Sequence, residues 1–229
     1  MRRAFAILAA MAALAGAQDP PKKAKHFWVG ATSGTSVKFK FTEEGGRTGV
    51  EEYLVKETTD DQFAFYRTLT VGESIAEQKE IAEFHADRCV HCAPASKPAG
   101  EETLKIGDKE YKCQVYKWTS TVQPIREVRT WIAEGVAWPV KSDWKMAAKG
   151  AHTSWQAVSV SEEIEAGGKK YACVKVEGTD QFGSGVNIKF TMWFSPEVPG
   201  GVVKAAVEGK QFGKDIKATR VLESVETPK

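Results

Sequence analysis

Residues 167–204 read GGKKYACVKVEG…TMWFSPEVPGGVVK, and residues 107–141 read GDKEYKCQVYKW…RTWIAEGVAWPVK. The two stretches align with a nearly constant offset: Tyr111 matches Tyr171 at 60, and Trp131 matches Trp193 at 62. Two copies are too few for a solenoid or a propeller, which stack several repeats. We therefore interpret the stretches as two related β-meanders, written one after the other in a single continuous sheet.

Alternation of apolar and polar residues runs through the whole chain. Residues 186–194 are the clearest case, because every second side chain there is apolar. A period of two is typical of half-buried antiparallel strands. Shorter runs of the same kind occupy residues 37–41, 50–57, 63–71, 103–106, 111–118, 126–133, 155–164, 170–176, 201–207 and 216–225. Glycine-rich turns separate them, so we predict an all-β fold: a strongly curved antiparallel sheet, half-barrel or barrel-like.

Residues 73–87 are less clear. They are rich in Ala, Glu, Lys and Gln, which are good helix formers. The same composition suits a long edge strand that carries charge on one face. We expect a strand, because the rest of the chain reads as strand.

The predicted organisation is a single β domain over residues 28–226. Its parts are an N-terminal unit at 28–86, a first repeat at 101–144, a second repeat at 153–209 and a last strand at 215–226.

The N-terminus has the features of a secretory signal. Arg2 and Arg3 precede a short apolar run, and Ala15-Gly16-Ala17 is a small-residue cleavage site. We expect residues 1–17 to be a signal peptide and residues 18–27 to be a flexible tail. The apolar run is too short to span a bilayer, and no other segment is apolar enough. An exported protein of the periplasm or the extracellular space is therefore expected, soluble after cleavage and not an integral membrane protein; an N-terminal membrane anchor is the alternative.

Charge and motifs argue against several functions. The formal net charge of +2 falls to 0 when Arg2 and Arg3 are removed, and the charged residues that remain are mixed in sign. Nucleic-acid binding needs clustered Lys and Arg, so we do not expect it. The chain has no G-x-S-x-G, no H-E-x-x-H, no glycine-rich phosphate loop and no EF-hand loop. We expect no enzyme, no catalytic residues and no cofactor.

The chain has four cysteines, and in an exported protein an even number favours disulfides. The candidates are Cys89, Cys92, Cys113 and Cys173. Residues Cys113 and Cys173 occupy equivalent positions of the two repeats, which intervening strands should separate. We therefore favour bonds from each into the Cys89–Cys92 loop, although the connectivity stays open. The alternative is that Cys113 and Cys173 are small buried hydrophobes.

Four potential metal ligands lie within eight residues, at His85, Cys89, His91 and Cys92. Cys and His suit zinc or copper, and the C-x-x-C spacing resembles a redox pair. A redox motif belongs in a βαβ context, which this chain lacks, and Ala93 stands where a haem motif needs His. A metal or redox role is therefore an alternative hypothesis to disulfides.

Aromatic and sulfur-containing side chains on the predicted strand faces are the ligand-lining candidates. They are Phe63, Phe65, Phe190, Met192 and Phe194, which could hold an acyl chain on a concave sheet. The alternative is an ordinary core.

The tryptophans of the repeats, Trp131 and Trp193, fall opposite the apolar stripe. We expect one face of the sheet to carry exposed indoles, unless a helix or loop covers them.

Several stretches carry a resemblance to known proteins. The opening HFWVGATSGTSVKFKF (26–41), the unit EEYLVKETTDDQFAF (51–65) and the later WFSPEVPGGVVK (193–204) resemble a group of exported bacterial β-proteins to which no reaction is assigned. The overall plan is similar to the curved half-barrel of periplasmic lipid and lipoprotein carriers of the LolA and LppX type. The resemblance implies a concave face that binds lipid or another apolar ligand. A structural or interaction module of the bacterial envelope is the alternative.

Overall fold

The computed structural model describes residues 28, 31–59, 62–84, 97–119, 127–146, 150–183 and 185–228. Within these residues the secondary structure consists of thirteen antiparallel strands in one sheet, with no helix. The strands are β1 (Ser36–Glu43), β2 (Thr48–Thr58), β3 (Gln62–Val71), β4 (Ser74–Phe84), β5 (Lys97–Ile106), β6 (Lys109–Thr119), β7 (Glu127–Ala133), β8 (Lys141–Met146), β9 (Ala151–Ala166), β10 (Lys169–Phe182), β11 (Val186–Phe194), β12 (Val202–Gln211) and β13 (Lys214–Glu226).

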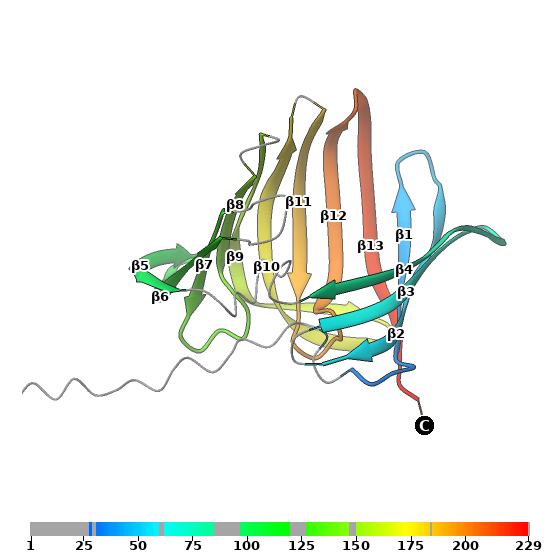
Figure 1. The fold of residues 1–229 in the computed structure, drawn as a ribbon, viewed down its shortest axis with the longest axis horizontal. Helices are drawn as coiled ribbons and strands as arrows, with labels where there is room; N and C mark the ends of the chain where they lie inside the picture. Colours follow the sequence, from blue (N-terminus) through cyan, green and yellow to red (C-terminus); the bar gives the residue numbers. More distant parts are fainter. Residues whose placement is uncertain are drawn as a thin grey trace, which may run out of the picture.

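Two meanders join to make this sheet. Strands β1 to β4 follow one another on one side, β5 to β13 follow one another on the other, and β1 pairs with β13 in the middle. Figure 1 shows β8 to β13 running side by side, with β2, β3 and β4 turned across the lower part of β12 and β13. Strands β4 and β5 end the order and do not pair with each other in the described part of the chain. The all-β, strongly curved sheet is thus confirmed, in its half-barrel form.

The segment at 73–87 is a strand from Ser74 to Phe84, as expected, and it forms the edge of the sheet beside β3. Its charges are partly neutralised by its neighbours, since Lys56 on β2 lies 2.8 Å from Glu80. An edge strand that carries charge resists pairing with another chain. The position of this segment beside β3, and not the helix propensity of its residues, therefore determines that it forms a strand.

The two repeats build the same local structure. Each consists of a hairpin and two further strands, β5 to β8 and β9 to β12. In the first, the Trp131 indole N–H donates to Glu102 at 2.7 Å, and Lys141 lies over the ring at 4.5 Å.

In the second, the Trp193 indole N–H donates to Glu162 at 2.9 Å, and Lys204 lies over the ring at 4.8 Å. The carboxylate of each set lies 60 positions from its counterpart, so the duplication includes β5 and β9 as well as the matched stretches.

The expectation of exposed indoles is wrong, because Trp131 and Trp193 are only 3% and 8% exposed. The end of the β9–β10 hairpin crosses the lower part of β12 and β13, where Gly167 lies against the backbone carbonyl of Glu223 (Figure 1). The first hairpin folds back in a similar way onto β9, where Gln156 donates to the backbone carbonyl of Lys105 at 3.3 Å. Both tryptophans join one buried core cluster with Tyr171 and Val203.

The loops after the two tryptophans differ because they pack against each other. The indole of Trp138, from the first loop, stacks on Phe194 at 4.6 Å. A Cβ on Gly201 in the second loop would lie 2.2 Å from the Trp138 ring, and one on Gly200 would lie 2.7 Å from Trp28. The Gly-Gly pair therefore leaves the space that the indoles of Trp138 and Trp28 occupy. The first loop carries Trp138 itself, so it supplies one of these indoles instead of receiving it.

The predicted signal peptide at 1–17 and tail at 18–27 lie outside the described residues. Among the residues that are described, no helix has the length and hydropathy required to cross a membrane.

Candidate functional site

A cavity of about 370 Å³ lies on the concave face over β10 to β13. Its lining residues are Asp180, Ile188, Phe190, Met192, Ala205, Val207, Ala218, Thr219 and Arg220. Pockets for small molecules occupy roughly 300–1,000 Å³ and are mostly apolar with a few polar groups. We call this the first cavity, and its size and lining match that description.

This face is hollow because large side chains on β11 lie beside smaller ones on the neighbouring strands. Phe190 pairs with Val207 on β12, Val207 pairs with Ala218 on β13, and Met192 pairs with Ala205. On the other side, Phe190 pairs with Gly178 on β10, where an added Cβ would lie 2.5 Å from the Phe190 ring. The glycine lets the ring lie across β10, and the alanines leave room above the sheet.

A second cavity, of about 220 Å³, lies beside the aromatic residues of the N-terminal unit. It is lined by Trp28, Phe39, Tyr53, Phe63, Phe65, Pro199, Gly200, Val202 and Arg220. The ring centroids of Trp28 and Phe65 are 5.2 Å apart, and Phe63 stacks on Phe65 at 5.8 Å. Arg220 lines both cavities, so the two apolar surfaces meet at one cation.

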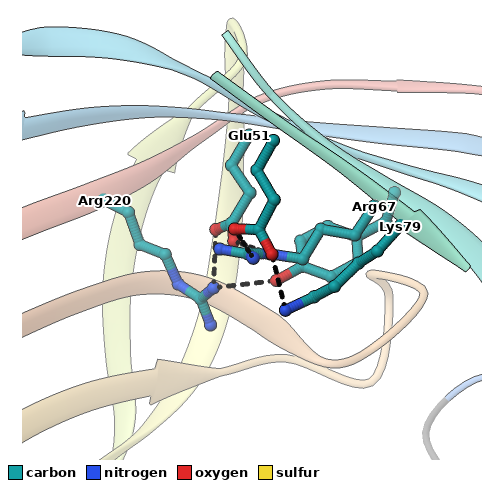
Figure 2. A network of polar contacts seen from close by, with 6 residues as sticks. Glu51, Arg67, Lys79 and Arg220 are labelled. Carbon is teal, nitrogen blue, oxygen red and sulfur yellow. Dashed lines mark hydrogen bonds and ion pairs between the residues drawn. The ribbon is translucent and has the colours of Figure 1, made fainter. Parts of the chain in front are cut away.

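A charged network holds β2, β3, β4 and β13 together at this point (Figure 2). The carboxylate of Glu51, only 7% exposed, accepts from Arg67 at 2.5 Å through one oxygen and from Arg220 at 3.0 Å through the other. Arg67 continues to Glu77 at 3.1 Å, and Lys79 lies 2.8 Å from Glu77. Buried charges need partners and hydrogen bonds of this kind to be tolerated.

The network favours an ionised Glu51. Burial alone raises the pKa of this carboxyl, but the charges of Arg220 and Arg67 and the hydrogen bonds from them outweigh it. The pKa of Glu51 therefore lies below its ordinary value. Burial raises the pKa of Tyr53, whose hydroxyl accepts from Arg220 at 3.4 Å. Three cations face two carboxylates, so the network carries one net positive charge.

Sequence patterns did not identify Glu51 and Arg220 as candidate site residues. The signal for them was a charge on the apolar face of a strand: Glu51 shares its face with Tyr53 and Val55, and Arg220 lies between Ala218 and Leu222 in period two. A single charged residue in an apolar row does not indicate a buried ion pair unless its partner is known. Glu51 and Arg220 are 169 residues apart in the sequence, so local patterns cannot pair them.

The predicted ligand-lining residues divide among three places. The first cavity is lined by Phe190 and Met192, and the second by Phe63 and Phe65. The fifth, Phe194, lines neither; it is 5% exposed and stacks on Trp138 in the core. Four of the five thus lie on the two surfaces that meet at Arg220, and one serves packing.

The cysteines of the repeats differ from the disulfide expectation. Both Cys113 and Cys173 are free, buried thiols, each donating to the backbone carbonyl of the Tyr two residues earlier at 3.5 Å. Burial raises the pKa of Cys173 to about 11 and raises that of Cys113 as well. Their surroundings agree with the alternative, small buried hydrophobes, while Cys89 and Cys92 lie outside the described residues and their pairing stays a prediction.

The metal candidates His85, Cys89, His91 and Cys92 also lie outside the described residues, and they stay a hypothesis. In the described part of the chain, no group of three or more His, Cys, Asp or Glu is arranged to hold a metal ion.

Comparison with known proteins finds only weak structural similarity. No protein-family model matches the chain, and no curated protein matches it. A solved LolA superfamily protein from Nitrosomonas europaea is similar with a TM-score of 0.39 and 7% identity, over 85% of this chain and 86% of that one. MucB, solved in complex with MucA(peri), is similar with a TM-score of 0.20 and 12% identity, over 84% and 88%. At these scores no role is transferred from either protein.

Proposed function

We propose that this chain is an exported, non-enzymatic binding protein that holds an apolar molecule, such as a lipid chain, on the concave face of its sheet. The observation that carries the proposal is the first cavity, whose floor is built from Ile188, Phe190, Met192 and Val207. Apolar surface gains roughly 25 cal/mol for each Å² removed from water, so an apolar occupant of this floor is stabilised.

Two further observations support this function. The second cavity adds an aromatic surface beside the first, with Trp28 and Phe65 in ring contact, and Arg220 is common to both. Export is supported by the sequence of residues 1–17, which has the features of a signal peptide.

The test fills the first cavity and compares it with an equal change on the other face. Ala218→Phe adds a ring to the cavity, whereas Ala206→Phe adds the same ring to the opposite face of the neighbouring strand. The mature protein is purified from the bacterial envelope, analysed by native mass spectrometry, stripped of lipid and titrated with N-phenyl-1-naphthylamine.

We expect a co-purifying apolar molecule, probe binding by wild type and Ala206→Phe, and at least tenfold weaker binding by Ala218→Phe. Wild-type protein that arrives empty and does not bind the probe would contradict the proposal and favour a structural module of the envelope. Equal binding by Ala218→Phe and wild type would move the ligand away from the first cavity.

A further inference from the structure

Arg220 has hydrogen-bonding capacity that the protein leaves unused. A guanidinium carries five N–H donors. The Nη1 group of Arg220 donates to Glu51 and to Tyr53, and the guanidinium lies over the Phe39 ring at 5.1 Å. The Nε and Nη2 groups make no hydrogen bond to any of the described residues. Figure 2 shows the second terminal nitrogen pointing away from Glu51.

The charge of Arg220 is only partly neutralised by its neighbours. Glu51 is shared with Arg67, whose other contact is Glu77, and Glu77 is shared with Lys79. The network therefore keeps one net positive charge, with Arg220 at its end. Its side chain is only 28% exposed, and a cation beside apolar surface is stabilised by a further anion.

The sheet register places this cation at one corner of an apolar floor. Arg220 pairs with Ala205, and Ala205 pairs with Met192, so these three form one row across the cavity. The acid Asp180 pairs with Ile188 two rows further along, at the opposite corner, and it accepts from Thr153 at 2.6 Å. If the anionic head of a ligand lies at Arg220, its alkyl chain would run over Met192, away from Arg220.

We propose that Arg220 is the head-group subsite of this binding face, and that the occupant is an anionic amphiphile with a carboxylate or phosphate head. The head accepts hydrogen bonds from the free N–H groups of Arg220, and the chain lies over Met192, Phe190 and Ile188. This inference rests on the proposed function and narrows its ligand class. Arginine suits this part because its planar fork matches carboxylate and phosphate oxygens.

The test uses four probes with the same ten-carbon chain and different heads: decanoate, decyl phosphate, decanol and decyltrimethylammonium. Titration calorimetry of the lipid-free mature protein at pH 7 gives an affinity for each. We expect decanoate and decyl phosphate to bind at least tenfold more tightly than decanol, a factor that corresponds to ~1.4 kcal/mol. The better of the two anions tells a fatty acid from a phospholipid as the source of the head.

Three variants separate the contribution of the ligand's head group to affinity from that of its alkyl chain. Arg220→Gln should remove the anion preference, so that decanoate, decyl phosphate and decanol bind this variant with affinities within about twofold of one another. Lys40→Gln, which removes the same charge from the exposed face of β1, should keep the preference. Arg220→Lys keeps the cation without the fork and should keep part of the preference. Circular dichroism and thermal unfolding of each variant show which ones fold, and Arg220→Lys keeps the subsite testable if Arg220→Gln does not.

The outcomes separate the two proposals. Equal affinity of wild type for all four heads would overturn the subsite while the proposed function stands. An anion preference that survives in Arg220→Gln, or a preference for decyltrimethylammonium, would overturn the assignment of the head to Arg220. Failure of wild type to bind any probe would overturn the proposed function and the subsite together.

Discussion

At the scale of single residues, Glu51 is the buried carboxylate that holds two arginines together on the concave face. A buried carboxylate is costly unless it is paired, and here each of its oxygens accepts from a different arginine. Because Arg67 and Arg220 come from different strands, β3 and β13, the carboxylate joins two distant parts of the sheet. It also prevents the two guanidinium groups from facing each other without a counter-charge.

We expect Glu51→Gln to lower the free energy of unfolding by about 2–3 kcal/mol at pH 7, since it leaves two arginines without their shared anion. The matched change Glu80→Gln removes an exposed carboxylate beside Lys56 and should have a much smaller effect on stability. Urea unfolding followed by tryptophan fluorescence measures both. Equal effects of the two changes would show that the network stabilises the protein no more than an exposed ion pair does.

The same residue predicts a pH dependence. The pKa of Glu51 in the folded protein lies below the ordinary 4.5, so between these two values the unfolded chain binds more protons than the folded one. Stability therefore rises with pH through this window, and it is lost as pH falls below about 4.5 and through the folded pKa. Unfolding curves between pH 3 and pH 7 should show a shallower acid loss in Glu51→Gln than in wild type; an unchanged slope would contradict the network.

At the scale of elements, the duplication explains more than the two matched stretches. Each repeat places a tryptophan between a carboxylate and a lysine, and each hairpin folds back over the strands that follow it. The two loops are complementary rather than equal, because Trp138 of the first packs on Gly201 of the second. Loss of the Gly-Gly pair from the first loop is therefore a consequence of packing.

A pair of glycine substitutions tests this packing. Gly201 and Gly213 have similar left-handed backbones, with φ of 76° and 80°. Only Gly201 is crowded, because its Cβ would lie 2.2 Å from Trp138, whereas nothing lies within 4 Å at Gly213. We expect Gly213→Ala to cost about 1 kcal/mol for the backbone alone, and Gly201→Ala about 2–4 kcal/mol. Thermal and urea unfolding give the difference; equal costs would mean that the two loops do not meet as described.

At the scale of the whole molecule, one ladder joins the two meanders. The pairing of β1 with β13 is the link between β1–β4 and β5–β13, and the Glu51–Arg220 bond reinforces it from the concave side. Strands β4 and β5 each have one neighbour in the described sheet, and the others have two. The centre of the sheet should therefore open less often than its ends.

Hydrogen exchange measured by mass spectrometry tests this expectation. Peptides from β12 and β13 should be the most protected. Peptides from β4 and β5 should exchange faster by at least tenfold, because their outer backbone groups have no partner strand among the described residues. Protection of β4 equal to that of β13 would contradict an open half-barrel and would indicate that another chain covers the edge.

Much of the architecture could be read from local patterns. Alternation located most strands, and the offset between Trp131 and Trp193 identified the repeats, because side-chain period and turn residues are properties of neighbouring positions. The same alternation placed Phe190 and Met192 on one face. It could not tell that Phe194, at the end of that stripe, belongs to the core, since only the loop carrying Trp138 decides this.

By itself, the sequence determined that this chain is a β-protein with one curved antiparallel sheet and a duplicated meander. Only the tertiary structure decided which faces are covered and where the two apolar surfaces meet. It buried Trp131 and Trp193 under crossing hairpins, and it brought Glu51 to Arg220 across the junction of the two meanders. The physical reason is range: period and turns act between neighbours along the chain, whereas burial and charge pairing depend on strands that become adjacent only when the sheet curves.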